Sequence, residues 1–535
     1  MINILKNKTN LVIAITVLWN LISVGLMATG VWSSEIVIFN TLLLGGLFIL
    51  LRAQDALGLF LLCLPFMVVI PNSVVANLPM WRPLAVFLFF VILIKYLVSS
   101  KFTIISTITR FANERLASWD KWLYILGGVA VASLLVARFP EHGAKQILFL
   151  LNIYLIYLCS LLAIENTQQK ALLIRYVKAS LLFTIALGFL QYGATLFSQP
   201  YYFWQYWAQL VSALYYGLPL AEVLSYSNSW FSANGSGQSL RMFGILQDTH
   251  AFGVIVIFAL ALWLSKINFE DKIGSLKLFV TSQNLRFWIG LVLLCFAVVA
   301  SGTRGIWVAM MAPLVLSVFL IYKFRAKWLF IFSLISYGLV IILFILYPWI
   351  STGLNWIRTV NTDDNFLDRA TSIYDLNESS NVGRLEIWQA SLGYAVRNPL
   401  GSGYGNFIVS ISNIPAGVSY EEASSQKDLK FNLPEKFVTA HSSYLHILVE
   451  LGIVGLVFFL GLWFSWVRLV WVYLKSWEFK INKNTLLITN LAMAIIWLLA
   501  YGLFDVTILN ERVLLYLMTL LAIINLSIKE SKKQK

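Results

Sequence analysis

The chain passes from a long polar loop into an apolar segment through Thr439-Ala-His-Ser-Ser-Tyr-Leu-His-Ile-Leu-Val-Glu-Leu-Gly-Ile-Val-Gly455. The apolar segment continues to about residue 474, and a membrane-spanning helix needs roughly 20 mostly apolar residues. The boundary therefore predicts the mouth of a transmembrane helix. His441 stands at that mouth, where an imidazole can take a proton from a hydroxyl group near neutral pH.

Similar apolar segments fill most of the chain. Of its 535 residues, 59% are hydrophobic and only 12% are charged, and the mean hydropathy is +0.78. The hydropathy criterion predicts an all-α polytopic membrane protein with about fourteen transmembrane helices in a single membrane domain, residues 1–535. We expect the spans near residues 11–32, 35–51, 55–70, 83–98, 122–138, 145–164, 172–197, 250–266, 287–303, 305–323, 327–349, 452–474, 485–504 and 512–528. The spans 287–303 and 305–323 are nearly continuous, and their separation rests on Ser301-Gly-Thr-Arg304.

Basic residues predict the orientation. An even number of spans puts both termini on one side of the membrane, and both termini are basic. About 26 of the 39 lysines and arginines fall on that side, which the positive-inside rule assigns to the cytoplasm. The net charge of +14 is then mostly a consequence of topology, and we do not expect nucleic-acid binding.

The basic residues left on the outer side are mostly arginine, whereas the cytoplasmic set is rich in lysine. Topology needs positive charge of either kind, but a guanidinium offers a flat bidentate donor pair that suits a diphosphate. Contact with lipid headgroups or solvent explains any single arginine at least as well. The set as a whole favours an anionic ligand on the outer face. Its members are Arg82, Arg138, Arg241, Arg304, Arg358, Arg369, Arg384, Arg397 and Arg512.

Two outer loops interrupt the apolar pattern. The first, residues 198–249, begins with a cluster of aromatic residues, which predicts either an interfacial belt or a platform for sugar rings. The second, residues 350–441, is too long for a simple connection. Within it, residues 383–392 predict an amphipathic helix, and Asn398-Pro-Leu-Gly-Ser-Gly-Tyr-Gly-Asn-Phe407 predicts a helix stop and a glycine-rich turn. Such a turn can offer backbone N–H groups to a phosphate.

The predicted spans carry almost no charged residues away from their ends. Ion- and proton-coupled carriers usually place ionisable groups near the middle of the bilayer. A coupled transporter is therefore disfavoured, although a charge-poor polysaccharide flippase without catalysis stays open as an alternative. A passive scaffold for envelope assembly is disfavoured by the outer arginines.

Several motifs, in this order along the chain, resemble the bacterial O-antigen ligase and polymerase family. The ligase pattern is His, then Asn, Ser or Gln, then nine residues, then Gly-x-x-Gly. Residues His441-Ser442 and Gly452-Ile-Val-Gly455 match it in full. Gly383-Arg-Leu-Glu-Ile-Trp388, followed by the glycine-rich turn, is similar to the signature of the family's large loop. Ser301-Gly-Thr-Arg304 resembles the Ser-Arg step that opens the conserved region.

A further segment extends the resemblance toward the N-terminus, so that the family-like catalytic region covers residues 240–460. Arg241-Met-Phe-Gly244 with Asp248-Thr-His-Ala-Phe-Gly253 is similar to the family's Arg…Gly…Asp-Pro-Asn…Gly segment. The chain departs from that segment at Thr249 and His250. Asp248 and His250 are also typical of a polar cluster at the start of a helix.

The resemblance implies roles for these residues. His441 would act as general base on the acceptor hydroxyl, or would orient it. Three arginines would bind the diphosphate and stabilise its charge as the glycosidic C–O bond breaks, namely Arg241, Arg304 and Arg384, of which Arg304 and Arg384 are counted with His441 as catalytic. Ser442, Trp388, Asp248 and His250 are the expected substrate-binding residues. His446 and Glu450 are i,i+4 partners and are expected to form a structural pair.

The resemblance also implies the substrates and the place of reaction. The donor would be a glycan on undecaprenyl diphosphate, and the transfer would be inverting and independent of metal ions, nucleotides and other cofactors. The protein would lie in the bacterial cytoplasmic membrane, with both termini in the cytoplasm and the active site on the outer, periplasmic side. The acceptor stays open: a lipid A core sugar in a ligase, a second lipid-linked repeat in an O-antigen or exopolysaccharide polymerase, or a protein in an oligosaccharyltransferase. A chain-length regulator is a further partner to consider.

Overall fold

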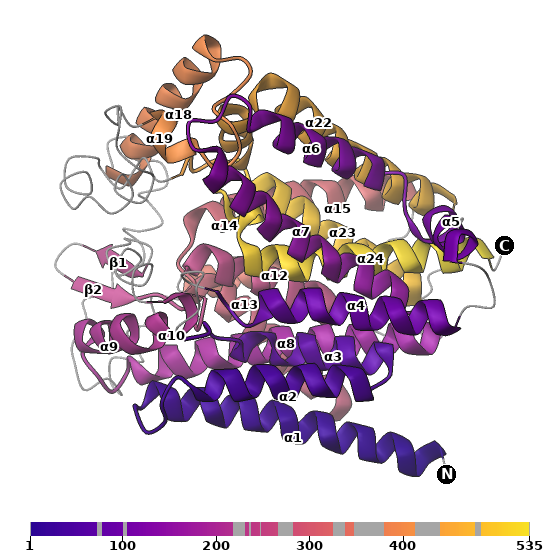
Figure 1. The fold of residues 1–535 in the computed structure, drawn as a ribbon. Coiled ribbons are helices and arrows are strands. Elements are labelled where there is room, and N and C mark those ends of the chain that lie inside the picture. The colour runs from indigo at the N-terminus through magenta and orange to yellow at the C-terminus, as the bar shows by residue number, and fades with distance from the viewer. Residues whose placement is uncertain are drawn as a thin grey trace.

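The computed structural model shows a bundle of helices with one small β-hairpin (Figure 1). It describes residues 2–71, 78–99, 104–217, 230–234, 237–246, 248–265, 282–324, 337–346, 379–411, 439–476 and 483–533. In these segments the antiparallel pair of β1 (Phe231–Asn234) and β2 (Gly237–Leu240) forms the single sheet. The predicted helical fold is confirmed apart from this hairpin.

Helices make up nearly all of the remaining regular structure. The first half of the chain contains α1 (Ile2–Ala28), α2 (Ile36–Leu50), α3 (Ala53–Cys63), η1 (Leu64–Phe66), α4 (Trp81–Ser99), α5 (Ile104–Arg115), α6 (Asp120–Ser133), α7 (Pro140–Ala163), α8 (Thr167–Ala194), α9 (Pro200–Tyr206), η2 (Trp207–Val211) and α10 (Ser212–Tyr216). The second half contains α12 (Thr249–Leu264), α13 (Ser282–Ala300), α14 (Arg304–Ala309), α15 (Met311–Phe324), α18 (Ser379–Arg397), α19 (Phe407–Ile411), α22 (Ser443–Ser476), α23 (Lys483–Tyr501), η5 (Thr507–Leu509) and α24 (Glu511–Lys533).

Seven of the described helices are long and apolar enough to cross a membrane, which makes this a multi-pass membrane protein. They are α1, α4, α7, α8, α22, α23 and α24. Six further apolar helices have only 10–17 residues, so the count of about fourteen spans is not confirmed. One reason is that apolar runs are longer than the helices they form: the predicted span 122–138 is the 14-residue α6, after which the chain turns. The predicted separation at Ser301–Arg304 is confirmed, because α13 ends at Ala300 and α14 begins at Arg304.

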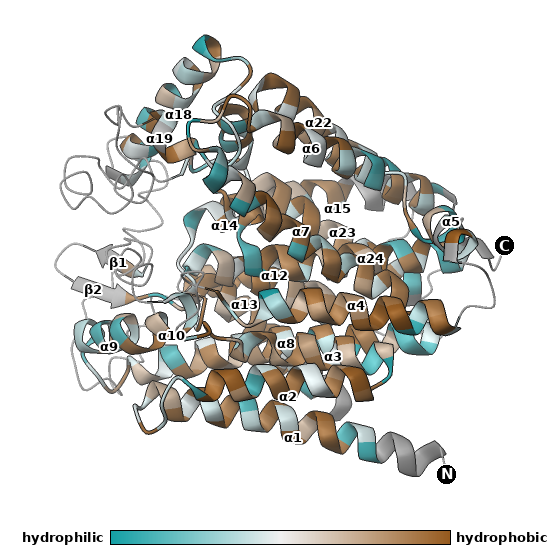
Figure 2. Cartoon of the chain, in the orientation of Figure 1, coloured by the Kyte–Doolittle hydropathy of each residue, from teal (hydrophilic) through white to brown (hydrophobic). Residues whose placement is uncertain are grey.

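The centre of the bundle is α12, almost all of whose side chains are buried. It packs against α8, α13 and α23, so it has little contact with the surroundings of the bundle. Helices at the rim expose large apolar side chains instead, including Leu42, Leu50, Val98 and Leu190. An apolar rim of this kind suits contact with lipid tails. Figure 2 shows the hydrophobic residues along the bundle helices and many hydrophilic ones on α9 and α18.

The two termini lie at the same end of the bundle (Figure 1). The hairpin, α9, α18 and α19 lie at the opposite end. The expected outer loop 198–249 therefore contains α9, η2, α10 and the hairpin where it is described. The predicted helix at 383–392 is confirmed as part of α18, which ends just before Asn398-Pro399. The remainder of the expected loop 350–441, residues 350–378 and 412–438, lies outside the described residues.

The helix α22 contains a break at Gly452, where φ is +66° and ψ is −169°. This backbone conformation is essentially restricted to glycine. A Cβ at Gly452 would lie 2.3 Å from the carbonyl oxygen of Pro399, so the break also brings the glycine-rich turn into close contact. The structure thus requires glycine at both ends of the Gly-x-x-Gly motif. At Gly455, a Cβ would lie 2.1 Å from the Cβ of Leu451.

The glycine-rich turn supplies hydrogen-bond partners to backbone groups of α22 on both sides of this break. The N–H groups of Ser402 and Gly403 donate to the carbonyls of Val449 and Glu450, each at 2.9 Å, and Ile453 N–H donates to Pro399 at 3.0 Å. We name this set of contacts the glycine clamp (residues 399–403 against 449–453). Because its N–H groups bond within the protein, the turn is not the phosphate cradle that its glycines suggested.

We predict that Gly452→Ala lowers the stability of the protein through the glycine clamp. Backbone strain alone should remove about 1–3 kcal/mol, and the clash with Pro399 adds to it. The measurement is the apparent melting temperature of the purified protein in detergent. Gly127→Ala in α6 is the matched control, because a Cβ there meets no atom within 4 Å and alanine favours a helix. Equal melting temperatures for the two variants would contradict the clamp.

Candidate functional site

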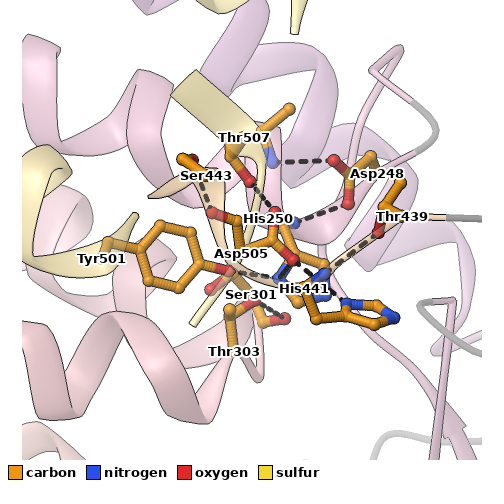
Figure 3. A network of polar contacts seen from close by, with 11 residues as sticks. Asp248, His250, Ser301, Thr303, Thr439, His441, Ser443, Tyr501, Asp505 and Thr507 are labelled. Carbon is orange, nitrogen blue, oxygen red and sulfur yellow. Dashed lines mark hydrogen bonds and ion pairs between the residues drawn. The ribbon is translucent and has the colours of Figure 1, made fainter. Parts of the chain in front are cut away.

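Three side chains from distant parts of the chain meet in one network of polar contacts (Figure 3). Asp505 lies in the turn between α23 and η5, His250 in the first turn of α12, and His441 two residues before α22. The Nδ1 atoms of His250 and His441 lie 3.3 Å and 3.8 Å from the same oxygen, Oδ2 of Asp505. We name these three residues the Asp505 cluster.

The carboxylate of Asp505 is almost completely buried, with 9% of the side chain exposed. Its Oδ1 atom accepts a hydrogen bond from the Thr507 hydroxyl, so both oxygens have polar neighbours. Burial alone would raise the pKa of this carboxyl, but the imidazoles of His250 and His441 and the Thr507 hydroxyl hold the pKa well below its usual range. Asp505 is therefore an anion at every physiological pH.

His441 has a strained backbone and a partly open side chain. Its φ of +45° makes it the one non-glycine residue with a positive φ among the described residues. Such a conformation persists only where the surroundings hold it, and it is common at functional sites. The ring is 34% exposed, and Figure 3 shows its second nitrogen on the side away from Asp505. That nitrogen is free to face a substrate while Nδ1 faces the carboxylate.

The start of α22 is fixed to the same turn that carries Asp505. Ser443 N–H donates to the carbonyl of Gly502 at 2.7 Å, and its hydroxyl donates to the carbonyl of Asp505 at 2.8 Å. Ser442 is buried, and its hydroxyl oxygen accepts from the N–H of Leu445 at 3.5 Å. Ser442 thus lies directly after His441, and the contact that the structure shows for its side chain is a cap of α22.

Asp248 is the N-cap of α12, as expected of a polar residue at the start of a helix. Its two carboxylate oxygens accept hydrogen bonds from the N–H groups of His250 and Ala251, at 2.9 Å and 3.2 Å. This cap orients the first turn, so that the ring of His250 reaches Asp505. The Tyr501 hydroxyl is hydrogen-bonded to the same Nδ1 atom of His250. Burial raises the pKa of Asp248, in contrast to Asp505.

The three arginines implied by the resemblance lie around this cluster. Arg241 follows β2, and its side chain runs over Gly302, where a Cβ would lie 3.1 Å from the arginine Cδ. Arg304 begins α14, and its Nη2 donates to the Ser380 hydroxyl of α18 at 2.9 Å. Arg384 lies one turn further along α18. The positive charges of Arg384 and Arg241 both act on the imidazole of His250.

Other members of the predicted outer arginine set are engaged elsewhere. Arg82 forms a salt bridge with Glu511 at 2.5 Å, and Arg512 donates to the carbonyl of Met67 and lies over the ring of Tyr215. Arg397 donates to a carbonyl of its own helix. Arg358 and Arg369 lie outside the described residues. The structure thus separates arginines with a packing role from the three near the cluster.

Two further predicted residues have mainly structural surroundings. Trp388 packs against an apolar group that joins α18, α19 and α22 and contains Ile387, Phe407, Ala440 and Val449. The predicted pair of His446 and Glu450 is confirmed, with 3.4 Å between Nε2 and Oε1. Glu450 also accepts the N–H of Phe407. These contacts stabilise the segment that carries His441.

Sequence reasoning missed Asp505, Thr507 and Tyr501 as members of the site. Asp505 is 64 positions from His441 and 255 from His250 in the sequence numbering, so no spacing rule connects them. A signal was present, because a lone carboxylate directly after an apolar span needs a partner when it is buried. Among the described residues, no group of three or more His, Cys, Asp or Glu side chains could hold a metal ion.

Comparison with known proteins supports the reading of this region. Residues 289–460 match the family model of O-antigen ligases, which confirms the resemblance drawn from the motifs. The match includes Arg304, Arg384 and His441 and supports an O-antigen ligase- or polymerase-like function in polysaccharide biosynthesis. Arg241 and His250 lie before its start. No curated protein sequence matches the chain.

We predict that Asp505→Asn lowers the stability by about 1.5–3 kcal/mol, the contribution of a hydrogen-bonded charged group. Because the pKa of the folded carboxyl is depressed, its stabilisation is complete above the ordinary value of about 3.9 and is lost only as the pH falls toward the folded value. The difference in melting temperature from the wild type should therefore be at least as large at pH 5 as at pH 8.

The matched control for this measurement is Glu35→Gln, the same chemical change at an exposed position. It should have little effect at either pH, because an exposed carboxylate contributes little to stability. A difference between Asp505→Asn and the wild type that vanishes by pH 5 would show that the pKa of Asp505 is raised instead of depressed.

Proposed function

We propose, from the family match and the geometry of the Asp505 cluster, that this protein is a membrane glycosyltransferase of the O-antigen ligase type. It moves a glycan en bloc from an undecaprenyl-diphosphate carrier to an acceptor hydroxyl on the outer face of the bacterial cytoplasmic membrane. The observation that carries the proposal is the pairing of a strained, partly exposed His441, inside the matched region, with the buried carboxylate of Asp505, close to three arginines.

His441 is the general base of the proposed transfer. The imidazole nitrogen that faces away from Asp505 takes the proton of the acceptor hydroxyl, and the oxygen attacks the anomeric carbon of the glycan. The bond between that carbon and the diphosphate oxygen breaks, and the electron pair leaves with the lipid diphosphate. Attack from the side opposite the leaving group inverts the configuration, as the family implies. Positioned base catalysis of this kind typically contributes about 10²–10⁴-fold.

Asp505 acts on the reaction through His441. A carboxylate at Nδ1 keeps the hydrogen on that nitrogen and stabilises the imidazolium that forms when the other nitrogen takes a proton. The separation of 3.8 Å is longer than a hydrogen bond, and catalytic hydrogen bonds often tighten only when substrate is bound. The depressed pKa of Asp505 suits this role, because the group has to be charged.

Arg241, Arg304 and Arg384 supply the positive charge that the leaving diphosphate requires. A polyprenyl diphosphate is already a good leaving group, so positioning and fixed charge can provide much of the catalysis. Guanidinium groups offer bidentate hydrogen bonds to phosphate oxygens. With this charge in place, the proposed transfer is independent of a metal ion. Both termini are assigned to the cytoplasm, since they lie at the end of the bundle opposite the cluster.

We predict that His441→Ala abolishes transfer while the protein level in the membrane stays close to the wild type. The measurement is the length distribution of lipid-linked and finished glycan in a strain that lacks the chromosomal copy and produces the variant. Long chains that accumulate on the carrier indicate a ligase. Single repeats on carrier and acceptor indicate a polymerase of the same family, which is the second candidate.

The control is His142→Gln, which changes a histidine of α7 outside the cluster and should leave the glycan pattern unchanged. A donor pool trapped on the cytoplasmic face, with His441→Ala behaving like the wild type, would reject the enzyme and favour a flippase.

We further predict that Arg304→Lys reduces transfer by about 10- to 100-fold, although the charge is kept. Lysine cannot reproduce the planar pair of donors, and one lost charged hydrogen bond is worth about 1.5–3 kcal/mol. The assay is the same glycan analysis. Arg397→Lys is the matched control, since Arg397 is an exposed arginine of α18 that bonds to its own helix. Equal activity of the two variants would argue for a passive role of Arg304.

A further inference from the structure

The carboxylate of Asp505 is held by contacts at Oδ1 and at the backbone carbonyl of the same residue, so that Oδ2 is the atom that faces the two imidazoles. Thr507 occupies Oδ1, and the Ser443 hydroxyl fixes the backbone carbonyl of the same residue. At Oδ2 the nearer imidazole is His250, at 3.3 Å, and His441 is the more distant one, at 3.8 Å. The orientation of Oδ2 toward His441 therefore depends on the contact that His250 makes with the same oxygen.

His250 is held more rigidly than His441. It lies in the first turn of the most buried helix of the bundle, below the Asp248 cap. Its ring is nearly parallel to that of Tyr501, with 17° between the planes, and the Tyr501 hydroxyl is hydrogen-bonded to Nδ1. The side chain is 16% exposed, about half the exposure of His441. A fixed imidazole beside a carboxylate can act as its anchor.

We propose that His250 is a positioning residue of the transfer reaction, which anchors the Asp505 carboxylate so that Oδ2 stays directed at Nδ1 of His441. This inference rests on the proposed function and assigns to His250 a role that does not require contact with the substrate. The anchor acts through the 3.3 Å contact between its Nδ1 and Oδ2 of Asp505, and its effect reaches the reacting atoms only through Asp505 and His441.

The charges around His250 are balanced. The carboxylates of Asp505 and Asp248 face it from the α23–η5 turn and the α12 cap, and the guanidinium groups of Arg384 and Arg241 act on it from α18 and the segment after β2. Tyr501 of α23 supplies a hydroxyl. With equal numbers of opposite charges nearby, a neutral imidazole at position 250 leaves the negative charge of Asp505 available to His441.

The proposal predicts distinct effects for two substitutions of His250. His250→Ala removes the anchor, so kcat should fall about 10-fold, as expected for one lost polar contact to a charged group, while KM for the donor changes little. His250→Asn should restore most of kcat, because the asparagine amide nitrogen is as many bonds from Cα as Nδ1. When the carboxylate turns away, the imidazole of His441 binds a proton less tightly. The acid limb of the pH–rate profile should therefore move to lower pH in His250→Ala and return in His250→Asn.

A double-mutant cycle tests whether the effect passes through Asp505. In an Asp505→Asn background, His250→Ala should reduce kcat by less than two-fold further, because the group that it anchors is already changed. The assay uses donor lipid extracted from cells that lack this protein, and their membranes as the source of acceptor. His446→Ala is the control: this histidine faces Glu450 and not Asp505, so its pH profile should match the wild type.

The outcomes separate this inference from the proposed function. If His441→Ala loses transfer, two results would overturn the anchor alone. One is a strictly additive effect of His250→Ala and Asp505→Asn, and the other is an unchanged pH profile in His250→Ala. A raised KM with unchanged kcat in His250→Ala would make His250 a substrate contact and also overturn it. Normal transfer in His441→Ala would overturn the proposed function itself.

Discussion

A buried carboxylate determines the arrangement of the candidate site in this protein. Taking the charge of Asp505 out of water is unfavourable by several kcal/mol unless hydrogen bonds and opposite charges replace the lost hydration. The chain meets this demand with groups from three places: the Thr507 hydroxyl, the imidazole of His250 and the imidazole of His441. Each of these contacts joins a different element to the turn after α23. The geometry of the site thus follows from the need to stabilise one anion.

Much of the fold could be predicted from the sequence, because membrane helices follow from local composition. The start of α22 after His441, the end of α18 before Asn398 and the separation between α13 and α14 are all visible in the sequence alone. The number of spans could not be predicted in this way. Hydropathy measures the length of an apolar run, whereas a helix also ends where tertiary contacts turn the chain, as at the end of α6.

The site was predictable to a lesser extent. Motifs singled out His441 and the three arginines, since each lies in a short pattern of fixed spacing, whereas His250 stood out as a departure from its motif and as part of a polar helix start. Asp505 belongs to no such pattern, and its role depends on a contact between the end of α23 and the start of α22. Composition also could not separate Arg82 and Arg512, which stabilise the packing, from Arg241, Arg304 and Arg384. That separation depends on the positions of acceptors such as Glu511 and the carbonyl of Met67.

The glycine clamp has a mechanical consequence. Residues 399–403 follow directly after α18, which carries Arg384, and residues 449–453 lie one short helical segment after His441. Because three backbone hydrogen bonds join these two segments, α18 and the first turns of α22 form one lever. A displacement of α18 is therefore transmitted to the first turns of α22 through backbone hydrogen bonds. Under the proposed function, anion binding at Arg384 and placement of the base at His441 would be two movements of a single rigid part.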